Sequence, residues 1–106
     1  MSTEDFRAYY EDHHRLIGEK YLAGYATRYV RRYLNSIPDT EGNLSPPQFD
    51  VLLEIWFPDE SAFRACSHRL NEPEITREIV LDEEKLFDRS QKRSYTVEEC
   101  ESIMNR

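Results

Sequence analysis

The first 24 residues carry an apolar stripe with helical spacing. Ser2 and Asp5 are typical of a helix start, because a hydroxyl can cap free amides and an acid there faces the positive end of the helix dipole. The residues that recur at spacings of three and four are Phe6, Tyr10, His13, Ile17 and Tyr21, with His14 on the same stripe. The stretch therefore predicts one amphipathic helix that ends near Gly24.

Two later stretches alternate with the period of a β-strand. Residues 26–35 are rich in Tyr, Val and Thr, and residues 49–57 are the clearest strand of the chain. One face of the first strand would hold Thr27, Tyr29, Arg31 and Tyr33. One face of the second strand would be wholly apolar and hold Val51, Leu53, Ile55 and Phe57. The other face would hold Asp50, Leu52, Glu54 and Trp56. The prolines and the glycine of residues 36–48 predict a loop between the strands.

The remainder of the chain predicts two helices and a short strand. Pro58 and Asp59 open a helix whose inner side would hold Ala62, Phe63, Cys66 and Leu70. Asn71 and Pro73 are typical of the start of another helix, which would run to about Leu86. Its acidic end, residues 82–85, is expected to be solvated, residues 92–97 to form a last strand, and the tail from Glu98 to be frayed.

The resulting order is helix, strand, strand, helix, helix, strand. This is a ferredoxin-like βαββαβ unit without its first strand, so the fold class is α+β. A chain of 106 residues has room for one compact domain, which we expect to span residues 1–106. A sheet of three or four strands with one helix-covered face would leave its other face exposed, and this favours a homodimer.

Charge and motifs narrow the functional classes. A net charge of -7 argues against a nucleic-acid module and against attraction to anionic membranes. Neither a signal peptide nor an 18-residue apolar run is present, which favours a cytoplasmic location. The chain has no phosphate-cradling glycine loop, no GxSxG and no dinucleotide fingerprint. We therefore expect any catalysis to be independent of cofactors.

Three stretches of the chain stand out together: STEDFRAYYEDHH (2–14), FDVLLEIWFPDESAF (49–63) and DEEKLFDRSQKRSYTVEE (82–99). In this order they resemble the EthD-like family of the dimeric α+β barrel superfamily. The stretch RYVRRYL (28–34) is most similar to fungal-type members that act on aromatic polyketides as small decarboxylases or dehydratases. Members of the family have a strand before the first helix, and here Met1 stands where that strand would already have ended.

The resemblance implies a cofactor-independent lyase, either a decarboxylase or a dehydratase, that acts on an aromatic polyketide intermediate. One alternative is a cofactor-free monooxygenase of the anthrone type. Another is a non-catalytic dimer that binds a small molecule or assists a partner enzyme. Because one superfold hosts many chemistries, the resemblance is stronger for the fold than for the activity.

His14 is the first candidate catalytic residue. An imidazole can accept and donate a proton near neutral pH, and the resemblance places a family histidine at this position. We expect His14, and not His13, to face a cavity between the first helix and the sheet, with Tyr10 and Tyr21 beside it. The alternative is a hydrogen-bonded histidine at the rim of the core. Glu11 and His14 have the spacing of a di-iron ligand pair, but no second pair exists, so no metal is expected.

Glu54 is the second candidate, because a carboxylate in an apolar strand is costly to bury unless it is paired. Arg31 or Arg32 on the neighbouring strand could pair with it, and the alternative is a solvated Glu54. An aromatic and cationic wall could bind a flat phenolic substrate, with an arginine as the carboxylate clamp. The residues assigned to substrate binding are Tyr10, Tyr29, Arg31, Tyr33 and Trp56.

Overall fold

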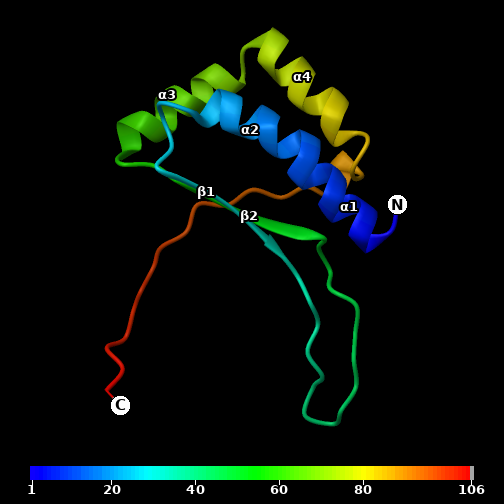
Figure 1. Cartoon of the computed structure of the whole chain (residues 1–106). Coiled ribbons are helices and arrows are strands. Elements are labelled where there is room, and N and C mark those ends of the chain that lie inside the picture. Colours follow the sequence, from blue (N-terminus) through cyan, green and yellow to red (C-terminus); the bar gives the residue numbers. More distant parts are fainter. Residues whose placement is uncertain (106) are drawn as a thin grey trace.

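The amino-terminal helix follows the predicted stretch closely in the computed structural model, which describes residues 1–105. Its parts are α1 (Thr3–Tyr9), a π-helical segment η1 (Tyr10–His14) and α2 (Arg15–Leu22) (Figure 1). The hydroxyl of Ser2 accepts a hydrogen bond from the backbone N–H of Asp5 at 3.0 Å. Gly24 has a φ of +86°, a left-handed conformation that glycine adopts without strain. The predicted start and end of this helix are therefore confirmed.

The π-helical segment keeps one line of side chains directed at the rest of the protein. The backbone N–H of Arg15 reaches the carbonyl of Tyr10, five residues back. In a regular α-helix, residues four apart drift by about 40° around the axis, so Phe6, Tyr10 and His14 would diverge. The wider turn opposes that drift. All three side chains are buried, with exposed fractions of 5%, 1% and 7%.

The two predicted strands pair as an antiparallel hairpin. β1 (Arg28–Tyr33) and β2 (Val51–Trp56) form the only sheet within residues 1–105, and a long loop joins them (Figure 1). The register sets Arg28 opposite Trp56 and Tyr33 opposite Val51. Because side chains alternate along a strand, this register divides them between two faces of the hairpin.

One face of the hairpin is turned toward the helices. Tyr33 and Val51 pack against the buried cluster of Phe6, Tyr10 and Leu86, which identifies this face. The row on the helix side comprises Tyr29, Arg31, Tyr33, Val51, Leu53 and Ile55. The opposite surface, called the open face below, comprises Arg28, Val30, Arg32, Leu52, Glu54 and Trp56.

Two further helices follow the hairpin, as predicted. α3 (Glu60–Leu70) begins after Asp59, whose side chain accepts a hydrogen bond from the backbone N–H of Ala62 at 2.7 Å. α4 (Pro73–Glu83) has its proline in the first turn, where a missing N–H costs nothing. A short 3-10 helix, η2 (Arg89–Gln91), comes after α4.

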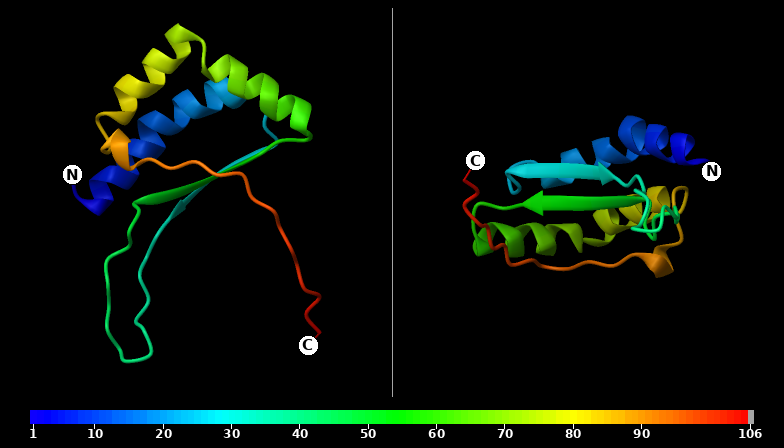
Figure 2. Two further views of the ribbon diagram at one scale, coloured as in Figure 1. Left: turned by 180° about the vertical axis from the view of Figure 1, so that it is seen from behind. Right: turned by 90° about the horizontal axis from the view of Figure 1, so that it is seen from below.

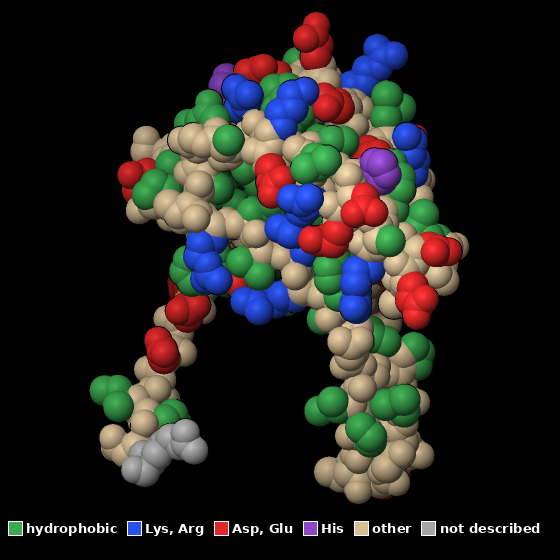
Figure 3. Space-filling view, in the orientation of Figure 1, with side chains coloured by type: hydrophobic (Ala, Val, Ile, Leu, Met, Phe, Trp, Pro, Cys, Tyr) green, Lys and Arg blue, Asp and Glu red, His purple; other side chains and the backbone are tan. Residues whose placement is uncertain are grey.

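All four α-helices lie on one side of the hairpin, so the molecule has one helical layer and one thin sheet (Figures 1 and 2). The buried cluster sits between them, and Tyr9 and Phe87 pack against its edge. The loop between the strands and the tail project away from this body, which carries interspersed acidic and basic side chains (Figure 3). The mixed α+β class is thus confirmed, while the sheet has fewer strands than a ferredoxin-like unit.

The strand predicted at residues 92–97 does not form, and this prediction was wrong. Among residues 1–105, no backbone hydrogen bond from residues 93–105 to another backbone group is present. Tyr95 and Val97 are 81% and 83% exposed. A strand requires a neighbour at about 4.8 Å. Figure 2 shows this segment running along the hairpin but apart from β2, so it is extended chain without a ladder.

Candidate functional site

The imidazole of His14 is held by a carboxylate from the other end of the chain. His14 Nδ1 lies 2.7 Å from Oδ2 of Asp82 in α4, and both residues are buried. The hydroxyl of Tyr9 donates to Oδ1 of the same carboxylate at 2.6 Å. Asp82 therefore joins two residues of the first helix to α4, and it fixes the orientation of the His14 ring.

The charge state of Asp82 decides which nitrogen of His14 carries the proton. Burial alone would raise the pKa of Asp82, but the hydrogen bonds from Tyr9 and His14 outweigh it and lower that pKa. An ionised carboxylate only accepts hydrogen bonds, so Nδ1 of His14 is the donor. In the neutral ring, Nε2 then carries the free lone pair of a base.

Nε2 of His14 is available for chemistry. It makes no hydrogen bond to any of residues 1–105. The His14 side chain is 9% exposed, so the ring is nearly buried. The edge of the Tyr10 ring packs against the imidazole, with ring centres 4.9 Å apart and planes at 73°. Burial, and next the neighbouring Tyr29, raise the pKa of Tyr10, so its hydroxyl stays protonated.

A second polar cluster lies between η1 and β1. Glu11 accepts hydrogen bonds from Arg31 Nε at 2.9 Å, Arg31 Nη2 at 2.8 Å and the Tyr33 hydroxyl at 2.6 Å. The bonds from Arg31, above all, lower the pKa of Glu11 to about 2. Burial and the bond to Glu11 raise the pKa of Tyr33. Glu11 thus balances the charge of Arg31, the residue predicted as the carboxylate clamp. Glu11 pairs with Arg31 whereas His14 pairs with Asp82, so the two residues have different partners.

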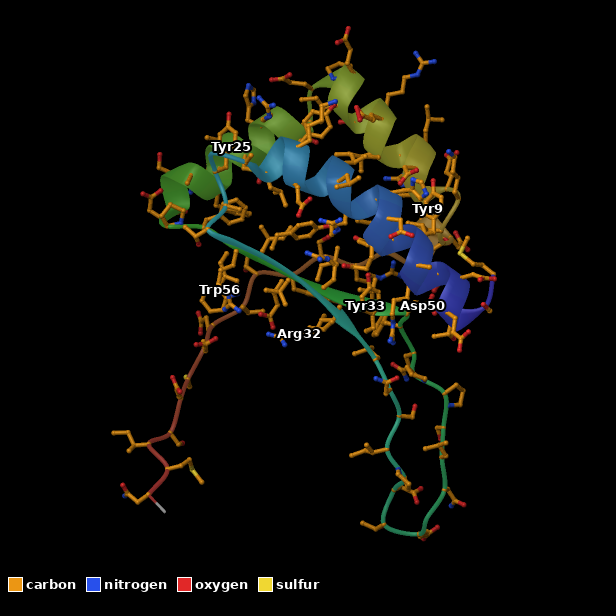
Figure 4. The ribbon with its side chains drawn as sticks, viewed as in Figure 1. Tyr9, Tyr25, Arg32, Tyr33, Asp50 and Trp56 are labelled. Carbon is orange, nitrogen blue, oxygen red and sulfur yellow. The ribbon has the colours of Figure 1, made fainter. Side chains whose placement is uncertain are left out.

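Glu54 belongs to the open face, on the far side of the sheet from His14. Arg32 donates to it through Nε at 3.0 Å and Nη2 at 3.2 Å, which confirms the predicted pairing with an arginine of the preceding strand. These hydrogen bonds lower the pKa of Glu54. Its side chain is 35% exposed within one chain, and its burial against a second copy stays a prediction. Figure 4 shows Arg32 and Trp56 on the side of the strands away from the helices.

The structure brings only part of the predicted site together. Tyr10 and His14 are in contact, and Tyr29, Arg31 and Tyr33 share the helix-facing row. Trp56 lies on the open face, so the predicted wall of Tyr29, Arg31, Tyr33 and Trp56 is divided by the sheet. Tyr21, expected beside the imidazole, donates instead to Glu78 of α4. Glu54 and His14 are not part of one site.

Two hollows of the described chain lie away from His14, where a cavity between the first helix and the sheet was expected. One hollow of about 510 Å³ is lined by Thr3, Glu4, Arg7, Ala8, Glu11 and Asn35. A smaller one of about 160 Å³ lies around the turn from α2 to β1. Neither is lined by His14. The imidazole is directed at α4 and not at the sheet, and aromatic rings fill the space beneath it.

Asp82 is the functional candidate that the sequence analysis missed. The expectation of a solvated helix end at residues 82–85 was wrong for Asp82 and Glu83, while Glu84 and Lys85 are exposed as expected. Asp82 is 8% exposed and Glu83 is 3% exposed. A signal was present, because Asp82 follows Ile75 and Ile79 on the inner stripe of α4 at helical spacing. A charged residue on an inner stripe predicts a buried partner.

A comparison with protein families settles the affiliation of the chain. The family model described as the EthD domain matches residues 1–90. The chain belongs to the EthD domain family. No curated protein and no solved structure matches it. The match covers both the His14–Asp82 pair and the hairpin of this EthD domain. Within residues 1–105, no helix is long and apolar enough to cross a membrane.

Proposed function

We propose that this EthD domain is a cofactor-independent lyase that removes CO2 or water from an aromatic polyketide intermediate. The observation that carries the proposal is the His14–Asp82 pair. A buried carboxylate orients an imidazole whose other nitrogen is free, and this is the arrangement of a positioned general base. Membership of the EthD family supports the substrate class, through the resemblance of RYVRRYL to polyketide-processing members.

Either reaction needs proton transfers that His14 could perform. In a dehydration, Nε2 would take the proton from the carbon next to the departing hydroxyl. The electron pair of that bond forms the new double bond, and the hydroxyl leaves as water with the proton that the imidazole passes to it. In a decarboxylation, Nε2 would first take the proton of the carboxylic acid. The electron pair of the breaking carbon–carbon bond then enters the phenolic ring system as CO2 leaves, and the protonated imidazole gives its proton to the carbon.

The remaining residues would bind and orient the substrate. Asp82 acts through His14 and is a positioning residue. Tyr10 and Tyr29 both have pKa values raised by burial, so their hydroxyls are hydrogen-bond donors beside a phenolic substrate. Tyr33 is fixed by Glu11. A flat substrate would have to displace aromatic rings to reach Nε2, because these rings fill the space under the first helix.

The proposal includes a homodimer formed through the open face. Leu52 and Trp56 are 51% and 38% exposed there, although both are large and apolar. Around them lie Arg28, which stacks on Trp56 with 5.5 Å to the ring centre, and the Arg32–Glu54 pair. A surface with both charges and an apolar centre can be complementary to a second copy of itself about a two-fold axis.

A non-catalytic dimer that binds an aromatic metabolite is the second candidate. It is favoured by the aromatic filling beside His14 and by the fact that Glu11 already balances the charge of Arg31. In this case the His14–Asp82 pair would only fasten the first helix to α4. The two candidates differ in one respect that can be measured, which is turnover.

The test is an assay of CO2 release and of absorbance change with a panel of hydroxylated polycyclic aromatic acids and their hydrates. We expect His14→Gln to lower kcat by about 100- to 10,000-fold, the range of a proton-transferring histidine. His13→Gln is the matched control, because His13 is exposed and stacks only on Tyr9. Binding without turnover by the unmodified protein would favour the non-catalytic candidate, and turnover by His14→Gln equal to that of the unmodified protein would exclude His14 as the base.

A further inference from the structure

The buried stripe of the first helix has one position without a side chain. Tyr10, His14, Gly18 and Leu22 follow one another at spacings of four residues, and the side chains of the other three are buried. Gly18 lies inside α2, where glycine is less favourable than alanine. A glycine at such a position indicates that a neighbouring group needs the space.

That neighbouring group is the phenol ring of Tyr29, which comes from β1. A Cβ atom at position 18 would lie 2.8 Å from both Cε2 and Oη of Tyr29, and 2.9 Å from Cζ. Carbon atoms in contact lie about 3.5–4.0 Å apart, so the ring fits against α2 only because Gly18 has no side chain. We call this space, which has the helix backbone at Gly18 as its wall, the glycine slot.

A hollow adjoins Tyr29 and offers its ring a second place. The hollow of about 160 Å³ is lined by Tyr29 and by residues of α2 and of the turn that leads to β1. A cavity of about 150 Å³ is large enough to hold a benzene ring. The atoms that fill the glycine slot are the end of a side chain and not backbone, so a change of rotamer can move them.

The glycine slot lies next to the group assigned to proton transfer. Gly18 follows His14 by one helical turn, a rise of about 6 Å along the axis. Tyr10 packs against the imidazole with ring centres 4.9 Å apart, and Tyr29 is one of the groups that raise the pKa of Tyr10, after burial. A fused aromatic ring system with one ring in the glycine slot would therefore extend toward His14.

We propose that Tyr29 is the gate of the substrate site. One ring of a flat, hydroxylated aromatic ligand enters the glycine slot, and the Tyr29 ring moves into the adjoining hollow. This inference rests on the proposed function, and it names the residue whose movement admits the substrate. The slot favours a flat ring, because its wall is backbone and its present occupant is a phenol. With the gate closed, the apparent affinity is reduced by the fraction of molecules in which the gate is open.

The test uses 2-naphthol, a flat phenol of two rings, as the probe. In the unmodified protein, we expect intermolecular nuclear Overhauser effects between naphthol protons and the α-protons of Gly18, which the Tyr29 ring otherwise covers. Tyr29→Ala removes the gate, so it should bind 2-naphthol about tenfold more tightly. Gly18→Leu should fill the slot and abolish binding. Tyr25→Ala is the matched control with unchanged affinity, because Tyr25 packs on Arg69 at the turn after α2 (Figure 4).

The gate and the lyase activity can fail separately. Absence of binding, binding without contact to Gly18, or a Tyr29→Ala affinity no higher than that of the unmodified protein would overturn the gate. The contacts to Gly18 are measured in the unmodified protein, so the result stands even where a variant does not fold. Turnover that depends on His14, without naphthol contacts at Gly18, would leave the lyase and exclude the gate. Contacts at Gly18 in a protein without turnover would support the gate and exclude the lyase.

Discussion

Replacing Glu11 by glutamine should destabilise the fold in a way that depends on pH. Folding lowers the pKa of Glu11 from 4.5 to about 2, chiefly through Arg31. At about 1.36 kcal/mol per pKa unit, this corresponds to at most about 3.4 kcal/mol. The Glu11 side chain is 35% exposed, so water screens part of the interaction. We expect Glu11→Gln to lower the free energy of unfolding by about 1–2 kcal/mol at neutral pH.

The sign of the pH dependence follows from the direction of the shift. A carboxyl whose pKa is lowered in the folded state contributes its stabilisation above the unfolded pKa, and loses it as pH falls through the folded value. The difference between the unmodified protein and Glu11→Gln should therefore shrink between pH 4.5 and about 2. Chemical denaturation at pH 7, 4.5 and 3 measures this difference.

Glu19→Gln is the matched control for Glu11→Gln. Glu19 pairs with Arg15 at 3.0 Å on the surface of α2, with 46% of its side chain exposed. Exposed pairs of this kind contribute little, so we expect a change within about 0.5 kcal/mol at all three pH values. Equal effects of the two substitutions, or a Glu11→Gln effect that does not vary with pH, would refute the reasoning.

Two other predictions concern the open face. Arg32→Ala should lower the denaturation midpoint, because the Arg32–Glu54 pair lies on the face that the proposed dimer covers and Glu54 would lose its partner there; an unchanged midpoint would show that this face is solvated in solution. Analytical sedimentation at micromolar concentration should give a dimer for the unmodified protein and a monomer for Trp56→Glu, because Trp56 lies on the proposed interface. A monomer for both would rule out the dimer.

Helix starts and strands that depend on residues adjacent in the sequence could be predicted from the sequence alone. Ser2 and Asp59 cap their helices, and Pro73 stands in the first turn of α4, as the local pattern indicated. The apolar alternation of residues 49–57 identified β2. The strand expected at 92–97 failed for a different reason. Strand formation depends on a hydrogen-bonding neighbour, and no local pattern in that segment reports whether one is present.

The candidate site was harder to predict, because its members meet only through the fold. His14 and Asp82 are 68 residues apart in the sequence, and the acidic run around Asp82 has the composition of a solvated helix end. The placement of Trp56 depended on the register of the hairpin, which sets Trp56 opposite Arg28 and away from Tyr29. Alternation predicts which residues share a face within one strand, but not which face of its neighbour they join.

The most direct test of the His14–Asp82 pair is the tautomer of the His14 ring. Two-bond proton–nitrogen correlation NMR on protein labelled with 15N distinguishes the protonated nitrogen from the free one. At a pH where the ring is neutral, the proton should lie on Nδ1, facing Asp82, and Nε2 should be unprotonated. A ring protonated on Nε2 instead would contradict the account, because the atom assigned to take the substrate proton would already carry one.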